Sequence, residues 1–228
     1  MHPETGTPQG GTVAPVLANV YLPYALDRWF DQVVKTHWRG EALWCRYADD
    51  WVCAFRYRDA AERCSRVLPK RLKKFNLQVA PEKTHRRRFS RCHPSMKQRV
   101  TLLGFACAWI PERHDVPRVM RRTARKKLQA ACQRLAPWMK EHRHLPEGDF
   151  FQRLHVRVRG HDNYYGVRGN SRSLTRFFRW AMDCTCKWLT RRGGQRSSYT
   201  WEEFARVLDR VKIARPCITE VKRRRVCA

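Results

Sequence analysis

Two short runs of apolar and aromatic residues flank a pair of aspartates in the first quarter of the chain. The runs cover residues 43–47 and 51–55, and Ala48, Asp49 and Asp50 lie between them. Runs of this length and composition predict strands, and a break of a few residues between two strands predicts a hairpin. The pattern therefore predicts a β-hairpin over residues 42–57 with the carboxylates of Asp49 and Asp50 at its tip.

The elements around this hairpin follow from the same kind of pattern. Residues 6–11 (Gly-Thr-Pro-Gln-Gly-Gly) predict a loop that leads into an apolar helix. Asp59 to Glu62 has capping-box spacing, and a helical stripe with a basic opposite face follows it at Ala61, Cys64, Leu68, Leu72 and Phe75. Residues 100–109 predict strand, and residues 111–117 predict a loop that we take as a domain boundary.

The second half of the chain has a helical period throughout. One stripe, which we expect to end near Pro137, runs through Met120, Ala124, Leu128, Ala131 and Leu135. Asp149 is placed to cap a short helix that stops before Gly160, and residues 174–191 form an amphipathic helix with a basic outer face. A second capping box begins at Thr200. The predicted fold class is α+β, an antiparallel hairpin with helices followed by an all-α bundle.

Charge narrows the choice of partner. The chain has 48 Lys and Arg against 20 Asp and Glu, a formal charge of +28, which favours a polyanion. The basic residues are interleaved with aromatic residues along the whole chain, as in nucleic-acid-binding proteins, and are not gathered beside one apolar helix as in membrane-surface proteins. With no apolar stretch long enough to span a bilayer and a polar N-terminus, we expect no membrane partner and a cytoplasmic protein.

The ten cysteines stand mostly singly in apolar stretches, so we expect reduced, buried thiols in place of a disulfide framework. Cys184 and Cys186 raise zinc binding as an alternative. Their one-residue spacing within a helical pattern directs the two side chains to different faces, which favours core cysteines.

Asp49 and Asp50 form the only adjacent aspartate pair in the chain. Carboxylate oxygens suit Mg²⁺, and divalent ions assist phosphoryl transfer by activating the attacking oxygen and stabilising the leaving group. A lone Asp-Asp pair in a hairpin is more often a turn than a metal site, so the metal interpretation depends on its context.

That context is an ordered set of motifs that resembles the reverse transcriptases encoded by group II introns. The motifs are residues 6–11, residues 14–22, Tyr47-Ala48-Asp49-Asp50, Pro81-Glu82-Lys83-Thr84, Leu102-Leu103-Gly104-Phe105, residues 160–167 with Asn170, residues 188–192, and Thr200-Trp201. Each motif is modest alone, and their order makes the resemblance specific. The block that begins at Gly160 resembles the maturase-specific thumb, which retroviral enzymes lack.

The resemblance implies a partial right-hand polymerase palm in residues 1–112, a helical thumb in residues 118–215 and a basic tail in residues 216–228. The thumb would bind intron RNA and assist splicing. Asp49 and Asp50 would be catalytic and would ligate Mg²⁺. The nucleotide and template would contact Pro8, Gln9, Gly10, Tyr47 and Lys83, and RNA would contact Arg176, Arg179, Lys187, Arg191 and Arg192.

Some of these roles have plainer alternatives. Lys83 is equally well a solvated surface lysine, and Tyr47 is either a nucleotide contact or a packing residue of the hairpin. His161, Tyr164 and Tyr165 are expected to order the thumb core and not to touch RNA.

The resemblance also has a departure. In this family a further catalytic aspartate lies on a strand before the Gly-Thr-Pro-Gln loop, and here Met1 stands five residues before Gly6. We therefore expect this chain not to polymerise alone, and we expect intron RNA, a primer-template and an N-terminal reverse transcriptase half as partners. A non-catalytic RNA-binding splicing factor and an inactive remnant of a mobile element are the alternative readings.

Overall fold

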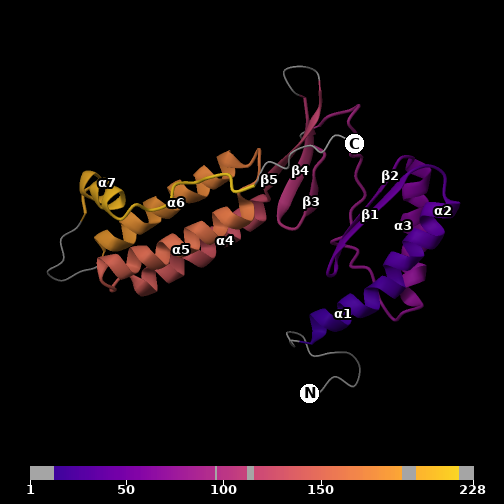
Figure 1. Cartoon of the computed structure of the whole chain (residues 1–228), viewed down its shortest axis with the longest axis horizontal. Helices are drawn as coiled ribbons and strands as arrows, with labels where there is room; N and C mark the ends of the chain where they lie inside the picture. Colours follow the sequence, from indigo (N-terminus) through magenta and orange to yellow (C-terminus); the bar gives the residue numbers. More distant parts are fainter. Residues whose placement is uncertain (1–12, 96, 112–115, 192–198, 221–228) are drawn as a thin grey trace. The chain divides into compact units, whose positions relative to one another are not determined.

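The computed structural model describes residues 13–95, 97–111, 116–191 and 199–220 (Figure 1). Contacts within the chain group it into two compact units, Met1–Arg88 and Phe89–Ala228. Both units contain helices and an antiparallel sheet, so the α+β fold class is confirmed. No helix in the described ranges is long and apolar enough to cross a membrane.

The first unit packs helices against one face of a hairpin. Its elements are α1 (Ala14–Leu22), η1 (Pro23–Asp27), η2 (Phe30–Val34), α2 (Lys35–His37), β1 (Ala42–Tyr47), β2 (Asp50–Phe55) and α3 (Arg58–Lys73). The two η segments are single turns of π-helix. β1 and β2 pair antiparallel in the predicted positions, so the hairpin prediction is confirmed.

Aromatic packing forms the core of this unit. The fully buried Phe30 ring lies 5.0 Å from Trp44 of β1 and 5.9 Å from Phe55 of β2, measured between ring centres. Leu68 and Leu72 of α3 are buried in the same cluster. Residues that alternate along the strands and residues that recur about every 3.6 positions along α3 thus pack into one core.

The start of α3 differs from the prediction. Tyr57 is the residue that precedes the helix, and no side chain caps the start of the helix with a hydrogen bond. Asp59 lies inside the first turn, and Ala60 is buried where Ala61 was expected. A capping box needs its first residue just outside the helix in extended backbone, and here Tyr57 takes that conformation.

The second unit begins with a sheet of β3 (Val100–Leu102), β4 (Phe105–Ile110) and β5 (Arg118–Thr123), ordered β3-β4-β5 and antiparallel. The strands predicted at residues 100–109 are confirmed. The helical stripe expected from Met120 is wrong at its start, because β5 pairs with β4 along its whole length and Met120 faces Ala108. The contacts divide the chain after Arg88, whereas the predicted palm reaches residue 112; those domain bounds stay a prediction.

Four helices complete this unit: α4 (Arg125–His142), α5 (Glu147–Tyr165), α6 (Ser171–Thr190) and α7 (Trp201–Arg210). α4 continues through Pro137 and α5 through Gly160, so both helices are longer than predicted. The capping box at Thr200 is confirmed, since Thr200 Oγ1 accepts from Glu203 N and a Glu203 carboxylate oxygen accepts from Thr200 N. Residues from all four helices share one core, with Met139, Phe150, Leu154, Leu189 and Phe204 almost fully buried.

The segment after α7 runs back along the bundle (Figure 1). Ala214 N donates to His155 Nδ1 of α5, and the N–H groups of Thr219 and Glu220 donate to Gly166 O. A Cβ at Gly166 would lie 2.4 Å from Asp162 O, so only glycine allows this close approach. These contacts tie residues 214–220 to α5 and to the α5–α6 junction.

Candidate active site at the hairpin tip

The tip of the β1–β2 hairpin is a two-residue turn. Tyr47 and Asp50 are the last paired residues, and Ala48 and Asp49 connect them. Ala48 has φ of 53°, a left-handed conformation that suits a tight hairpin turn but costs a residue with a side chain about 1 kcal/mol. The turn places Asp49 and Asp50, which are adjacent in the chain, at the end of the sheet.

Both aspartates and the preceding tyrosine face solvent. Tyr47 is 67% exposed, and Asp49 and Asp50 are both exposed. In the described ranges neither carboxylate forms an ion pair, and no third His, Cys, Asp or Glu joins them to make a three-ligand group. The site therefore offers hard oxygen donors, and no cation among the described residues neutralises them.

An ion pair beneath the tip fixes the turn. Arg46 Nε and a terminal nitrogen donate to the Asp27 carboxylate at 2.9 and 2.7 Å, and the other terminal nitrogen of Arg46 donates to Ala48 O at 2.9 Å. Trp44 Nε1 also donates to Asp27, at 2.8 Å. The Asp27 carboxylate on η1 thus positions Arg46, and Arg46 in turn binds the carbonyl of Ala48, the residue before Asp49.

The pair is electrostatically well matched. The hydrogen bonds from Arg46 hold the pKa of the Asp27 carboxyl below its usual range, and the bond from Trp44 adds to this against the opposing effect of burial. The same contact raises the pKa of Arg46. Sequence reasoning missed Asp27, because nothing in the spacing of 19 residues shows that the two side chains meet.

The other predicted nucleotide contacts are less defined. Lys83 is exposed in a turn, where its N–H donates to Ala80 O at 3.1 Å, and no recorded contact within the described residues joins it to the hairpin. Pro8, Gln9 and Gly10 lie outside the described residues. The structure thus places Tyr47, Asp49 and Asp50 at the hairpin tip but does not link Lys83 with them.

The predicted RNA-binding residues follow one side of α6. Exposed cations recur at Arg172, Arg176, Arg179, Lys187 and Arg191, at spacings close to one helical turn except between Arg179 and Lys187, which lie about two turns apart. In the described part of the chain none of them has an ion pair. Arg192 lies outside the described residues. This row, which we call the α6 basic face, carries five exposed cations, and the exposed Asp183 lies among them between Arg179 and Lys187.

The motif that begins at Gly160 packs within the second unit. The His161 ring stacks on Phe177 with 3.8 Å between ring centres, and Tyr165 lies edge-on to Phe105 at 5.2 Å. Tyr164 is 56% exposed, yet its hydroxyl donates to Leu103 O at 3.1 Å. These contacts join α5 to α6 and to the turn between β3 and β4, as expected for residues that order the unit.

Asn170 completes that junction from a fully buried position. Its Oδ1 accepts from Thr123 N, and its Nδ2 donates to Thr123 Oγ1 and to Tyr165 O, all at 2.8 to 2.9 Å. A buried amide with its hydrogen bonds satisfied fixes geometry more than it adds net stability. Asn170 thereby sets where α6 begins relative to β5.

Comparison with known families found a similarity over the first part of the chain. Residues 2–107 match the family model described as reverse transcriptase (RNA-dependent DNA polymerase). The match contains the hairpin, Asp49, Asp50 and Lys83, and it ends within β4. A comparison with curated proteins gave no match.

Proposed function

We propose that the chain, whose residues 2–107 match the reverse transcriptases, is the C-terminal portion of a group II intron-type reverse transcriptase/maturase. One observation carries the proposal: the matched segment contains a tight hairpin that presents Asp49 and Asp50 to solvent without a neutralising partner in the described residues. Carboxylates kept free in so basic a chain suit a catalytic metal more than a structural ion pair.

The donor set at the tip fits Mg²⁺. Magnesium keeps several of its waters and takes one or two carboxylates together with substrate phosphates, which two adjacent exposed aspartates allow. When bound, the ion supplies Lewis-acid stabilisation of the phosphate oxygens. Asp49 and Asp50 hold it, Arg46 fixes the backbone of the turn, and the exposed Tyr47 ring offers a surface on which a sugar or base stacks.

The second unit would bind the RNA. Its α6 basic face carries exposed cations on a helix whose opposite side is anchored in the core. Neutralising RNA phosphates with such cations releases counterions, which drives binding. Intron RNA, a primer-template and an N-terminal reverse transcriptase half are the proposed partners, and a cytoplasmic location is part of the proposal.

Metal titration tests the proposal directly. Mn²⁺ replaces Mg²⁺ at oxygen sites and is visible by electron paramagnetic resonance, so we expect the chain to bind Mn²⁺ and Asp49→Ala to weaken that binding strongly. Asp59→Ala is the matched control, since Asp59 is an exposed aspartate on α3 in the same unit. If Asp49→Ala and Asp59→Ala bind Mn²⁺ as the unchanged chain does, the hairpin is not the metal site.

A non-catalytic RNA-binding splicing factor is the second candidate, and the α6 basic face favours it. The two candidates separate in an intron-splicing assay combined with primer extension. The splicing factor predicts that Asp49→Ala leaves splicing intact and that no partner restores polymerisation, whereas the polymerase reading predicts polymerisation that depends on Asp49.

A further inference from the structure

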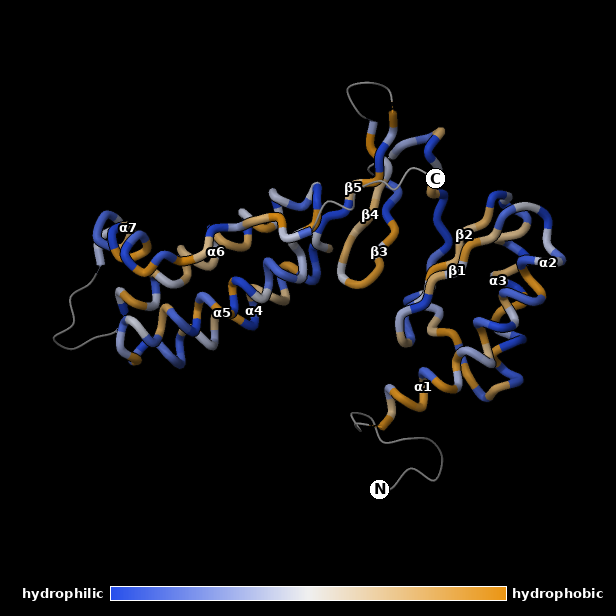
Figure 2. The backbone as a smooth tube through the Cα atoms, viewed as in Figure 1, coloured by the Kyte–Doolittle hydropathy of each residue, from blue (hydrophilic) through white to orange (hydrophobic). Residues whose placement is uncertain are grey.

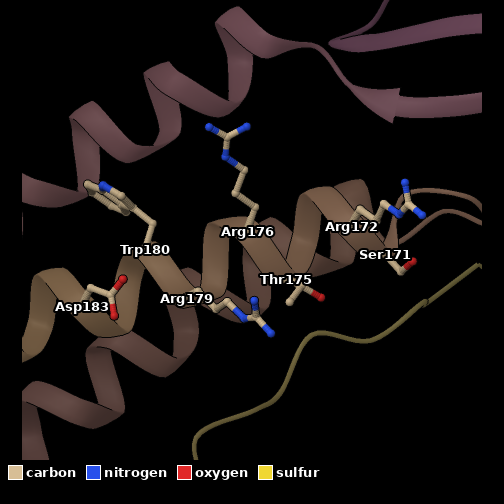
Figure 3. Close-up of a pocket in the computed structure, with 7 residues that line it drawn as sticks. All are labelled: Ser171, Arg172, Thr175, Arg176, Arg179, Trp180 and Asp183. Carbon is tan, nitrogen blue, oxygen red and sulfur yellow. The ribbon is translucent and has the colours of Figure 1, made fainter. Parts of the chain in front are cut away.

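A groove of about 490 Å³ lies along α6, and its lining combines three kinds of side chain. Residues four apart on a helix lie in one row, and two neighbouring rows border the groove. One row carries Arg172, Arg176 and Trp180, and the next carries Thr175, Arg179 and Asp183. Figure 3 shows Arg176 and Trp180 along one edge of this surface and Arg179 and Asp183 along the other.

Each kind of side chain suits one part of a nucleotide. The three arginines are exposed and have no ion pair within the described residues, so they are available to phosphate oxygens. Trp180 is half-buried and packs against the core of the second unit, which holds its ring in place while leaving part of it open. An anchored indole is a good stacking surface for a base.

Asp183 distinguishes this groove from a simple phosphate track. It is exposed, and no cation within the described part of the chain pairs with it, although Arg179 lies one turn away. A carboxylate repels phosphate but accepts hydrogen bonds from the exocyclic amino groups of adenine, cytosine and guanine. A surface that only followed a duplex backbone would gain nothing from a carboxylate or an indole.

We propose that this groove is a binding site for an unpaired nucleotide segment, with a base stacked on Trp180, its amino group bonded to Asp183 and the flanking phosphates on Arg172, Arg176 and Arg179. The inference rests on the proposed RNA binding of the second unit and adds what that unit recognises. Stacking and edge bonding both require a base that is not paired within a duplex.

The test uses the full chain and two probes of equal length and charge, an unpaired RNA oligomer and an abasic oligomer. We expect the RNA oligomer to bind on the order of tenfold more tightly, since base–aromatic stacking has about that strength. Trp180→Leu should remove this preference and leave abasic binding unchanged. Trp180→Phe, which keeps an aromatic ring against the core, should retain most of it, so a loss caused by misfolding is recognised.

Two further variants complete the design. Arg176→Gln should weaken binding of both probes, whereas Arg66→Gln on α3, an exposed arginine of the other unit, should have the smaller effect. Unpaired oligo-A should bind more tightly than oligo-U, which has no amino group, and Asp183→Ala should abolish that difference.

The possible failures are distinct. A chain that binds neither probe contradicts the proposed function of the second unit. A chain that binds RNA and abasic oligomers equally, or a Trp180→Leu variant that loses affinity for both to the same extent, overturns the groove as a base-binding site and leaves the proposed function standing. Equal binding of oligo-A and oligo-U would remove Asp183 from the site.

Discussion

The two units place their apolar surface differently. In the first unit α1 buries none of its residues, and Val16 and Val20 are each 60% exposed, although α1 is drawn largely as hydrophobic in Figure 2. In the second unit α6 buries six residues in the core and exposes mainly charge. The long helix of the second unit thus buries its apolar residues, whereas the first unit has a buried core but leaves the apolar residues of α1 largely exposed.

The largest expected effect is the loss of stability caused by a cavity in the core of the second unit. Leu154 on α5 is fully buried in the cluster shared by the helices. Leu154→Ala should lower the free energy of unfolding of the second unit by about 2–5 kcal/mol, because the protein loses the transfer free energy of the removed atoms and also bears the cost of the cavity that they leave. Val156→Ala on the same helix, at a position 64% exposed, should change it by less than about 0.5 kcal/mol in the same denaturant titration. Equal effects of the two variants would show that α5 is not packed as described.

In the first unit the sensitive position is a charge pair. Asp27→Asn leaves the Arg46 guanidinium without its anion, and Arg46 is only 11% exposed. We expect a loss of about 1–3 kcal/mol in the unfolding of this unit, less than for a fully buried pair because Asp27 is 28% exposed. A loss equal to that of Asp59→Asn, an exposed aspartate without this role, would contradict the account.

The same pair predicts a pH dependence. The pKa of Asp27 is lowered in the folded chain, so its carboxylate contributes stability that is complete above the unfolded value of about 3.9 and is lost as pH falls through the folded pKa. Denaturant titrations from pH 5 to pH 2.5 should show this acid-linked loss in the unchanged chain and a smaller one in Asp27→Asn. Parallel pH profiles would mean that the pair does not form in solution.

Charge on α6 should matter for RNA, and equal charge on α3 should matter less. Replacing Arg176 and Arg179 with Gln removes two cations from the α6 basic face, and the log–log salt dependence of RNA binding should flatten by ~1.4–1.8. Lys70→Gln combined with Lys73→Gln on α3 removes the same charge from the first unit and should flatten it less. If both pairs act alike, RNA is held by the overall charge and not by α6.

The smallest expected effect is at the hairpin turn. Ala48→Gly relieves the left-handed conformation, worth ~1–2 kcal/mol for an L-residue, against the greater flexibility of glycine, worth ~0.5–1 kcal/mol, so the first unit should gain up to about 1.5 kcal/mol. Ala54→Gly at an exposed position inside β2, one residue before its end, should have the opposite sign. A destabilising Ala48→Gly would show that the turn is not strained.

Local patterns in the sequence predicted elements whose structure depends mainly on interactions between residues close together in the chain. The hairpin and the capping box at Thr200 depend on neighbours within a few residues, and both are confirmed. β5 was missed because Met120 and Ala124 also fit a helical period, and only pairing with β4 decides the matter. Pro137 and Gly160 did not end their helices, since packing of α4 and α5 outweighs the local propensity at these positions.

The same division applies to the candidate site. The exposed positions of Tyr47, Asp49 and Asp50 at the tip follow from the local pattern around residues 43–55. Asp27 and the groove at Trp180 could not be predicted, because the first needs a contact between η1 and β1 and the second depends on how α6 is rotated in the bundle. Periodicity gives the face of a helix but not its partners.

Primer extension tests the central claim most directly. The chain is assayed with Mg²⁺ on an RNA template alone, mixed with an N-terminal reverse transcriptase half, and in the same mixture carrying Asp49→Ala. Two-metal transfer needs enough ligands to hold two ions about 3.5–4 Å apart, and no three His, Cys, Asp or Glu residues cluster in the described part of this chain. We predict no extension by the chain alone, extension by the mixture, and its loss with Asp49→Ala. Extension that survives Asp49→Ala would contradict the assignment of the hairpin as the catalytic metal site.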